Sequence, residues 1–384
     1  MSAKGGLVCP PVYYDIPAKE NAFMDTGVRL NMPLVNMPLA LRQWTDPVNL
    51  LQMFGLSMRL MVPIKYRWDM VFTANGGWAH GKRALAANFL LPIRQPEKEH
   101  FWEWFTRLGF QVETGALRGI PTEPHYIAWE GQGDTLMGSR GHCFFGWGVR
   151  SDYEARPYIE DMLEPGEETV PLRLVGDFYH LDTCLTALRP RDTLIYYPPA
   201  FSLESQNLIE SLPENRLLLS AYLANCFAAN SIYLDDVLLL NVPFPASEES
   251  CLLSAHGEFL TESDTRFKEL DRFDGGEWEK RPRLVRKLKE QGIEYPFRAK
   301  HDCLNAGYIW LIRQLWDLDM KIVPVYTSQF ELSGAGVRCC VMFLDWLPEG
   351  GPKVPNSMEG PKVPSAPVVS PSTLLSLGVN GPSK

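Results

Sequence analysis

Residues 141–149 (GHCFFGWGV), 153–163 (YEARPYIEDML) and 170–174 (VPLRL) give the clearest local signal of the fold. The first and third stretches are short and apolar, which is typical of buried strands. The middle stretch places its apolar side chains at helical spacing. Together these stretches predict a strand–helix–strand unit.

The same order of elements recurs along the chain. The predicted copies combine strands at 71–74 and 84–92 with a helix at 98–108, strands at 192–197 and 216–219 with a helix at 203–212, and strands at 232–240 and 320–325 with a helix at 306–318. No linker-like sequence separates these units, each of roughly 60 residues. The repeats therefore favour one α/β domain built from modules.

The composition of the 384-residue chain is that of a folded, acidic protein. Hydrophobic residues make up 45% of the chain and charged residues 22%. These proportions exclude a mostly disordered, collagenous or coiled-coil protein. The chain has 37 lysines and arginines against 46 acidic residues, a formal net charge of −9. Since proteins bind nucleic acids through clustered positive charge, we expect no nucleic-acid partner.

Neither a membrane span nor an export signal is expected. The best apolar candidate, residues 31–41, is interrupted by Pro33 and Pro38 and is shorter than the roughly 20 residues of a spanning helix. The first residues, MSAKGGLVCPP, lack the apolar region of a signal peptide. The eight cysteines show no metal-site spacing. We therefore expect a cytoplasmic protein with reduced thiols, no metal and no cofactor.

Two segments differ in composition from the modular body, which we expect to span residues 1–349. Residues 350–384 are dominated by Pro, Ser, Gly and Val and contain GPKVP at 351–355 and again at 360–364. So few large apolar side chains cannot offset the entropy of ordering, which predicts a disordered tail. Residues of about 245–304 mix many charges of both signs and predict a solvated insertion.

Four polar, glycine-containing stretches, each flanked by strand-like sequence, carry the residues able to do chemistry. They are DMVFTANGG at 69–77, WEGQGD at 129–134, FYHLDTC at 178–184 and SGAGVRCC at 333–340. Loops at strand ends are where proteins usually place reactive side chains. Each stretch taken alone is a weak signal, because each has an ordinary structural explanation.

A cysteine, a histidine and carboxylates from these stretches could share one pocket. On an extended segment His180 and Asp182 would point to the same face, although they could equally satisfy the backbone of a turn. A nucleophilic cysteine needs a nearby base, and a histidine oriented by a carboxylate such as Glu130 is one. On a strand, Cys339 and Cys340 would point to opposite sides, so at most one can enter the pocket. Most buried cysteines are simply small apolar side chains.

Taken together and in this order, the four stretches resemble the motifs of the guanidine-modifying superfamily. This superfamily includes arginine deiminases, dimethylarginine dimethylaminohydrolases and amidinotransferases. VFTAN resembles its substrate-binding strand end, EGQGD its glutamate motif, YHLDTC its histidine motif, and GAGVRCC the GGGVRC stretch that carries its nucleophile. The resemblance covers residues 7–243 and 305–345. It implies a five-bladed, pseudo-symmetric α/β propeller (pentein) of ββαβ modules.

The resemblance also implies roles for individual residues. Cys339 would be the nucleophile, and His180 the general acid and base. Glu130 would grip the guanidinium nitrogens and orient His180. Asp182, the second acidic position in HxD, would bind the guanidinium as well.

Three further positions concern the substrate. Arg94, in PIRQPE, falls where related enzymes hold an arginine against the substrate carboxylate, and Asn21, in KENAFMD, matches an asparagine after the N-terminal CPP strand. Deiminases and dimethylarginine hydrolases typically have an acidic residue at the position of Asn75. An asparagine in a TAN motif resembles the arginine dihydrolases instead. The alternative is that Asn75 caps a turn in an enzyme that stops at citrulline.

The sequence thus predicts a cofactor-independent cysteine hydrolase that acts on the guanidinium group of arginine through a covalent thiouronium intermediate. A dihydrolase would release ornithine, ammonia and carbon dioxide, and a deiminase would release citrulline and ammonia. Dimethylarginine hydrolysis and amidino transfer stay open, and so does homo-oligomerisation. A hypothesis of another class, a catalytically silent scaffold protein, also stays open.

Overall fold

The computed structural model describes residues 3–24, 35–113, 126–242 and 306–347. Within these ranges the strands form five three-stranded sheets. Each sheet has one antiparallel and one parallel pair of neighbouring strands. The expected tail at 350–384 and the expected insertion at 245–304 lie outside the described residues.

Each sheet, together with one longer helix, makes up one unit of the fold. The first three units are β1 (Gly5–Val8), α1 (Met37–Met53), β2 (Ser57–Leu60) and β15 (Met342–Leu344); β3 (Gly77–His80), β4 (Arg83–Ala86), α2 (Lys98–Leu108) and β5 (Gln111–Val112); and β6 (Thr135–Met137), β7 (His142–Trp147), α4 (Arg156–Met162) and β8 (Glu168–Arg173). The last two are β9 (Leu185–Leu188), β10 (Thr193–Tyr196), α6 (Leu203–Ser211) and β11 (Asn215–Leu218); and β12 (Ile232–Leu234), β13 (Val237–Val242), α10 (Ala306–Asp317) and β14 (Lys321–Tyr326).

Four of the units follow one order along the chain: strand, antiparallel strand, helix, parallel strand. In the second unit, β3 pairs antiparallel with β4, and β4 pairs parallel with β5 after the chain has passed through α2. Parallel neighbours need such a crossover connection, which the helix supplies. The prediction of a modular α/β fold is therefore confirmed.

The first unit is assembled from both ends of the described chain. Strand β1 pairs in parallel with β2 and antiparallel with β15, so that Gly5 lies opposite Leu344. A Cβ atom on Gly5 would lie 2.1 Å from the carbonyl oxygen of Ser57. Only glycine allows this close approach of the two backbones.

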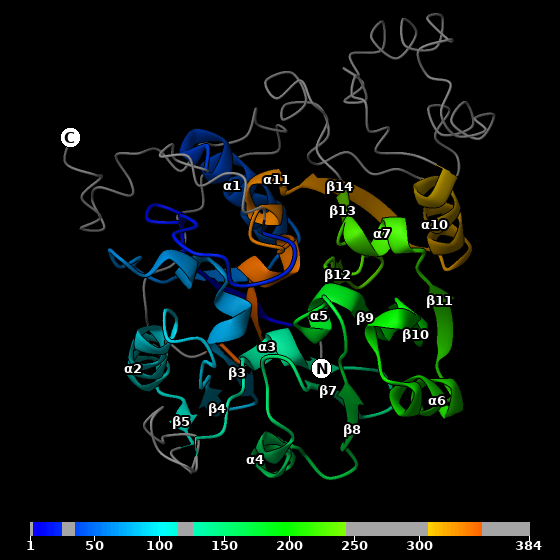
Figure 1. Cartoon of the computed structure of the whole chain (residues 1–384), viewed down its shortest axis with the longest axis horizontal. Coiled ribbons are helices and arrows are strands. Elements are labelled where there is room, and N and C mark those ends of the chain that lie inside the picture. The colour runs from blue at the N-terminus through cyan, green and yellow to red at the C-terminus, as the bar shows by residue number, and fades with distance from the viewer. Residues whose placement is uncertain (1–2, 25–34, 114–125, 243–305, 348–384) are drawn as a thin grey trace, which may run out of the picture.

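The longer helices α1, α2, α4, α6 and α10 lie around the outside of the molecule (Figure 1). Helix α2 shows why its sequence takes this place. Its side chains Phe101, Phe105 and Leu108 are buried at helical spacing and pack against its own sheet. Gly109, at φ 89°, ends the helix in the left-handed conformation.

Shorter helices occupy the loops between the strands. They are α3 (Gly131–Asp134), α5 (Leu181–Cys184), α7 (Ala221–Asn225) and α11 (Ser328–Glu331), together with 3₁₀ turns that include η1 (Trp68–Val71), η2 (Thr73–Gly76), η3 (Gln95–Glu97), η5 (Tyr153–Ala155) and η9 (Val337–Cys340). In Figure 1, α3 and α5 lie toward the middle of the view, inside the ring of longer helices.

The structure corrects several predicted elements. Residues 71–74 form parts of η1 and η2 and not a strand, because a buried apolar run fits a tight turn as well as a strand. The strand predicted at 84–92 ends at Ala86. The single strand predicted at 232–240 is the hairpin of β12 and β13, with Asp235 at φ 49° in its turn. Helix α1 was not predicted.

Among the described residues, no helix combines the length and the hydropathy that crossing a bilayer requires.

Candidate active site

The four polar stretches meet in the folded chain. The turn η2 packs against α3 and η9, and α3 also packs against α5. Glycines in EGQGD make this approach possible. Gly131 has φ 59°, and a Cβ atom there would lie 2.5 Å from the backbone nitrogen of Gly77. A Cβ atom on Gly133 would lie 2.4 Å from Asn75 Nδ2.

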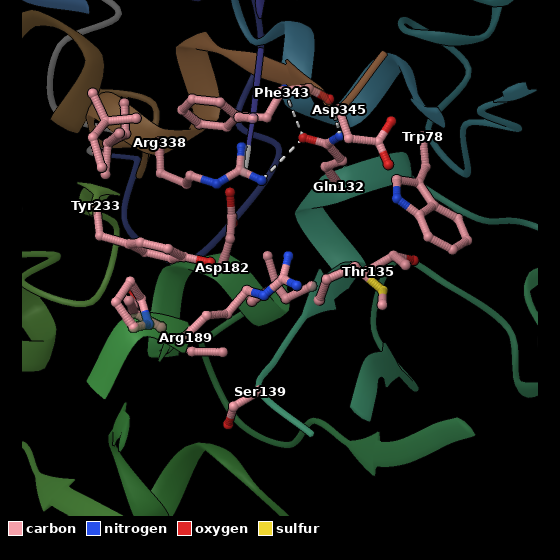
Figure 2. A pocket seen from close by; sticks show the side chains of 18 of the residues that line it. Trp78, Gln132, Thr135, Ser139, Asp182, Arg189, Tyr233, Arg338, Phe343 and Asp345 are labelled. Atoms are coloured by element: carbon pink, nitrogen blue, oxygen red, sulfur yellow. Dashed lines mark hydrogen bonds between the residues drawn. The ribbon is translucent and has the colours of Figure 1, made fainter. Parts of the chain in front are cut away.

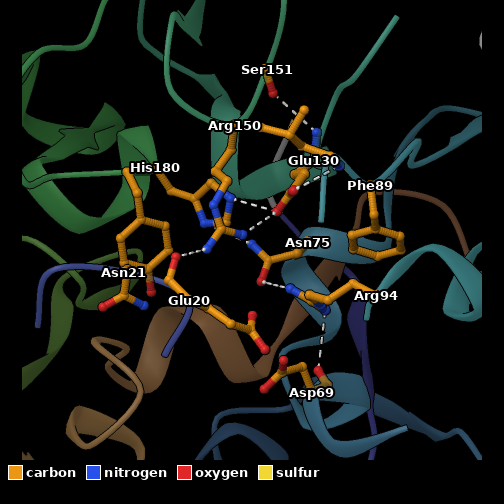
Figure 3. Close-up of polar contacts among 12 residues, drawn as sticks. Glu20, Asn21, Asp69, Asn75, Phe89, Arg94, Glu130, Arg150, Ser151 and His180 are labelled. Carbon is orange, nitrogen blue, oxygen red and sulfur yellow. Dashed lines mark hydrogen bonds and ion pairs between the residues drawn. The ribbon is translucent and has the colours of Figure 1, made fainter. Parts of the chain in front are cut away.

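A buried chain of hydrogen bonds joins Arg94, Asn75, His180 and Glu130 (Figure 3). Arg94 Nη1 donates to Asn75 Oδ1 at 2.9 Å, so the amide nitrogen of Asn75 faces His180 Nδ1 at 3.2 Å. An amide nitrogen can only donate, which leaves Nδ1 as an acceptor. The proton of the neutral ring therefore sits on Nε2, which donates to Glu130 Oε2 at 2.9 Å.

The electrostatics of this chain keep Glu130 ionised and His180 neutral in the unliganded site. Burial alone would raise the pKa of Glu130, but the charge of Arg150 and the hydrogen bond from His180 lower it to about 2. Burial lowers the pKa of His180 to about 4, against the opposing effect of Glu130. Glu130 is thus the fixed anion of the site, and its Oε2 accepts the hydrogen bond from His180.

Arg94 is held firmly by its own neighbours. Its Nη2 donates to Glu97 Oε2 at 2.9 Å and to the carbonyl oxygen of Asp69 at 3.2 Å, and its guanidinium lies over the ring of Phe89. With the bond to Asn75, these contacts use much of its donor capacity. The structure thus brings Arg94 into the site, bound to protein groups.

A second arginine, Arg150, is a site residue that the sequence does not predict. Its Nη1 lies 3.3 Å from Glu130 Oε2, its Nη2 donates to the carbonyl oxygen of Glu20 at 3.1 Å, and its guanidinium lies over the ring of Tyr179. The residue stands alone after β7 in sequence, with no companion motif. Its contacts in the folded chain reveal it.

Two more carboxyl groups, Glu20 and Asp69, lie beside the arginines (Figure 3). They share a hydrogen bond, and burial raises the pKa of both groups, that of Glu20 to about 8. The charges of Arg94 and Arg150 oppose this rise. This part of the site therefore combines two fixed cations with two carboxyl groups that can take up protons.

Cys339 lies at the other end of the site, next to Asp182 and Asn230. Its Sγ is 3.4 Å from Asp182 Oδ2 and 3.1 Å from Asn230 Nδ2. Burial and the neighbouring Asp182 raise the pKa of the Cys339 thiol well above its ordinary value. Burial also raises the pKa of Asp182, to about 7, although Arg338 and two hydrogen bonds oppose it. One Asp182 oxygen, Oδ1, is buried and has no hydrogen-bond partner in the described part of the chain.

The predicted geometry of the histidine and cysteine motifs is wrong in detail. The backbone is extended at His180 but turns into α5 at Leu181, so His180 faces Glu130 while Asp182 faces Cys339. Cys339 and Cys340 lie in the 3₁₀ turn η9 and not on a strand. The Sγ of Cys340 lies 3.7 Å from the carbonyl oxygen of Gly336 in that turn.

Asn21 lies against the glycine-rich turn that precedes the nucleophile motif. Its Nδ2 donates to the carbonyl oxygen of Ser333 at 2.8 Å. The hydroxyl of Tyr179 donates to the carbonyl oxygen of the next residue, Gly334, at 2.9 Å. Gly334 has φ 76°, and a Cβ atom there would lie 3.0 Å from Asn21 Oδ1. Asn21 and Tyr179 therefore position this turn.

A cavity of about 500 Å³ lies beside the cysteine end of the site (Figure 2). Residues of β3, β6, β9, β12 and β15 line it, one strand from each of the five units. Arg338 and Gln132 form part of its wall and are joined by a hydrogen bond of 3.0 Å. Of the predicted site residues, Asp182 is the one that lines this cavity.

The described residues include no cluster of three side chains able to ligate a metal ion. Their six cysteines, at 9, 143, 184, 226, 339 and 340, are all free thiols.

The fold and these motifs match proteins that act on guanidinium groups. The bifunctional arginine dihydrolase/ornithine cyclodeaminase ArgZ of Synechocystis sp. is 33% identical over 240 residues, and AgrE of Nostoc sp., described in the same words, is 32% identical over 248 residues. These matches cover 62% and 64% of this chain but 32% and 33% of the relatives. The chain therefore spans about a third of the length of these two relatives.

A third relative is matched over most of its length. The N(G),N(G)-dimethylarginine dimethylaminohydrolase of Mycobacterium tuberculosis is 32% identical over 250 residues, which are 65% of this chain and 76% of that protein. The chain belongs to the guanidine-modifying superfamily. No protein-family model matches the chain.

Solved structures of related proteins have a similar fold. The N-terminal domain of ArgZ, an arginine dihydrolase with bound product, has a TM-score of 0.61 and 26% identity and covers 88% of this chain and 96% of that domain. The dimethylarginine dimethylaminohydrolase of Pseudomonas aeruginosa, with a TM-score of 0.54 and 16% identity, shows the same fold.

Proposed function

We propose that this protein hydrolyses the guanidinium group of arginine through a covalent intermediate on Cys339. The observation that carries the proposal is the contact of 3.4 Å between Cys339 Sγ and the buried carboxylate of Asp182. A guanidinium is a planar cation whose nitrogens pair with carboxylates in fixed geometry. A guanidinium held by Asp182 would bring its central carbon next to the thiol.

The first half of the reaction forms the thiouronium. In the empty site the Cys339 thiol keeps its proton, because burial and Asp182 disfavour the thiolate. The bound guanidinium supplies a positive charge that favours the thiolate, and neutral His180 takes up the proton that the thiol loses. The thiolate attacks the guanidinium carbon, and a C–N bond breaks as protonated His180 gives its proton to the leaving nitrogen. Ammonia departs, and Glu130 stabilises His180 during the proton transfer.

The second half of the reaction releases the product. Neutral His180 takes a proton from water, and the oxygen adds to the thiouronium carbon. The C–S bond then breaks, and citrulline leaves Cys339. A deiminase stops here, after consuming one water and releasing one ammonia. A dihydrolase consumes a second water and converts the ureido group into carbon dioxide, a second ammonia and ornithine.

The dihydrolase reaction is the better supported of the two. The asparagine of the TAN motif, Asn75, donates to His180 and accepts from Arg94. ArgZ and AgrE are described as arginine dihydrolases, and the similarity to ArgZ extends over its N-terminal domain. A structure of that domain in an asparagine-to-serine variant holds a covalently bound reaction intermediate. Dimethylarginine hydrolysis is the alternative, supported by the mycobacterial relative.

Product analysis tests the proposal. The protein is incubated with arginine, with dimethylarginine, and with arginine plus glycine, and ornithine, citrulline and guanidinoacetate are resolved. Ornithine from arginine supports the dihydrolase. Citrulline without ornithine rejects it in favour of a deiminase, or of a dimethylarginine hydrolase if only the methylated substrate reacts. Guanidinoacetate shows amidino transfer, and no turnover at all favours a catalytically silent scaffold protein.

We expect Asn75→Asp to change the product from ornithine toward citrulline. The second hydrolysis acts on a neutral ureido group, whose oxygen accepts hydrogen bonds. An amide can donate to that oxygen, and a carboxylate repels it. Loss of one such donor costs roughly 10²-fold in rate, so the ornithine-to-citrulline ratio should fall by about that factor. The ratio is measured by chromatography of stopped reactions.

Asn88→Asp is the matched control, because Asn88 is also fully buried and bonds to Lys98 outside the site. An unchanged product ratio in Asn75→Asp would show that Asn75 only caps a turn.

We expect kcat/KM for arginine to depend on the ionisation of Asp182. Burial raises the pKa of this carboxyl to about 7 in the free protein. Below that pH the neutral acid cannot pair with a guanidinium, so kcat/KM should fall about tenfold per pH unit as the pH drops. Above about pH 7 the carboxylate is ionised and the profile should level off. A pH profile with melting temperatures measured in parallel tests this, and a flat profile between about pH 5.5 and 7 contradicts it.

The remaining site residues bind the amino-acid part of the substrate in this proposal. Arg94 contacts Asn75 and Arg150 contacts Glu130, and the substrate carboxylate would lie between these two cations. Asn21 acts through the turn at Ser333.

We also propose that the five units close into a five-bladed propeller, which the pairing of β1 with β15 supports.

We further propose that residues 1–349 act as one catalytic domain and that the tail at 350–384 is dispensable for turnover. Deleting the tail and measuring arginine turnover tests this division. The free thiols support a reducing compartment such as the cytoplasm as the place of action.

A further inference from the structure

Asn230 is a fully buried residue in the loop between α7 and β12. It lies outside the four motifs, and its sequence neighbourhood predicts no role for it. Its backbone nitrogen donates to the carbonyl oxygen of Phe227 at 2.9 Å, which fixes the loop locally. Its side chain points to the turn that carries Cys339.

All four hydrogen-bonding positions of the Asn230 amide are used. Nδ2 donates to Cys339 Sγ at 3.1 Å and to the carbonyl oxygen of Asp182 at 3.0 Å. Oδ1 accepts from the backbone nitrogens of Arg338 at 2.9 Å and Cys339 at 3.2 Å. The opposite orientation of the amide would point its N–H groups at two backbone N–H donors. The nitrogen therefore faces the sulfur.

The sequence of the nucleophile motif allows this contact. A Cβ atom on Gly336 would lie 2.8 Å from Asn230 Oδ1 and 3.1 Å from Asn230 Cβ. Any larger residue at this position would push the turn away from the asparagine. The second glycine of GAGVRCC is thus explained by Asn230.

We propose that Asn230 is a catalytic residue, whose side-chain N–H stabilises the Cys339 thiolate and whose carbonyl oxygen holds the turn that presents it. The proposal rests on the proposed function for the choice of Cys339 as nucleophile. Because one amide also binds the backbone of Asp182, it fixes the nucleophile relative to the carboxylate that would hold the substrate.

The charges around Cys339 show why this donor matters. Asp182 and Cys340 raise the pKa of the Cys339 thiol and so disfavour the thiolate. Tyr179 places a buried hydroxyl near the sulfur. Arg338 is the nearby cation. The guanidinium of Arg338 points to Val341 and Gln132. Among the described side chains, Asn230 is the hydrogen-bond donor that reaches Sγ, and an N–H donor favours the anionic sulfur.

Alkylation of Cys339 tests the proposal without any substrate. Asn230→Ala is treated with iodoacetamide at several pH values between about 7 and 9, and the Cys339-containing peptide is followed by mass spectrometry. Loss of the donor should raise the thiol pKa by about one unit, so alkylation should be about tenfold slower at each pH. kcat for arginine should fall by a similar factor, with KM changed less than about threefold.

If Asn230 had only a structural role, its loss would change the Cys339 alkylation rate in the opposite direction. A loosened turn exposes the thiol, so alkylation at an unchanged or faster rate in Asn230→Ala overturns the proposal. Asn230→Asp keeps the acceptor for both backbone nitrogens and replaces the donor with an oxygen, so it covers the case in which the alanine variant does not fold. Its alkylation should be slower than that of Asn230→Ala.

Asn241→Ala is the control for the loss of a buried asparagine. Asn241 is also fully buried, and its Nδ2 donates to the carbonyl oxygen of Cys226, away from the site. Its Cys339 alkylation rate should equal that of the parent protein. If arginine is not a substrate, the alkylation result still decides the role of Asn230. If arginine turns over normally in Asn230→Ala, the proposal fails while the proposed function stands.

Discussion

Cys339→Ser should lower kcat for arginine by roughly 10⁵-fold. A serine hydroxyl has a far higher pKa than a thiol, so neutral His180 would deprotonate it far less readily than it deprotonates Cys339, and the nucleophile would stay un-ionised. Asp182, the closest carboxylate, is itself disfavoured as an anion by burial. Binding should survive, because Asp182, Glu130 and Arg150 remain. The measurement is steady-state ammonia release, together with calorimetric titration of arginine into the variant.

Cys340→Ser is the control, since Cys340 lies in the same turn, is buried and hydrogen-bonds to Gly336. We expect its kcat to stay within about threefold of the parent. The opposite pattern, with activity lost in Cys340→Ser and kept in Cys339→Ser, would move the nucleophile by one residue. An adduct on Cys339 of the parent protein, with the mass of arginine less one ammonia, would support the covalent route directly.

His180→Gln should lower kcat by about 10³-fold, within the usual range for loss of a general acid and base. Glutamine can still hydrogen-bond to Glu130 or Asn75, so the buried Glu130 keeps a partner and the fold is preserved. It cannot give a proton to a leaving nitrogen or take one from water. Rapid-quench experiments should show that both the formation and the decay of the thiouronium are slowed.

His142→Gln tests whether any buried histidine would have the same effect. His142 also pairs with a buried carboxylate, Glu214, but it lies on β7 away from the four motifs. Its substitution should lower the melting temperature and leave kcat within a few-fold. If both histidine variants lose activity in proportion to their loss of stability, His180 has a structural role and the assignment is wrong.

The repeating order of strands and helices could be predicted from sequence because each unit carries its own local pattern. The helix at 98–108 and the strand at 141–149 are confirmed, within two residues at either end, since their apolar side chains recur with helical or strand spacing. Residues 71–74 could not be predicted correctly, because their burial comes from neighbouring units and not from sheet pairing. Local sequence says that these residues are buried, but not in which backbone conformation.

The site was predictable where its residues occur in clustered motifs. Glu130, His180 and Asn75 come together as expected, and so do Asp182 and Cys339. Their catalytic and binding roles stay predictions.

Arg150 and Asn230 could not be found from sequence, because each is a single polar residue in an unremarkable loop. Their partners are 20 and 109 residues away along the chain, in elements whose adjacency only the fold determines. Glu97 is another site residue that the sequence alone does not reveal. Its ion pair with Arg94 is local in sequence, but it depends on both side chains being buried.

The pairing of β1 with β15 has a consequence for the timing of activity. The turn that carries Cys339 leads directly into β15, whose antiparallel partner is β1, the first strand of the described residues. During synthesis β1 emerges early and must wait for residue 344 before this edge is paired. Asn230 and Asp182 are made long before Cys339, so a growing chain has a prepared site without a nucleophile. The appearance of the proposed arginine hydrolysis should therefore report that the sheet of β15, β1 and β2 has been completed.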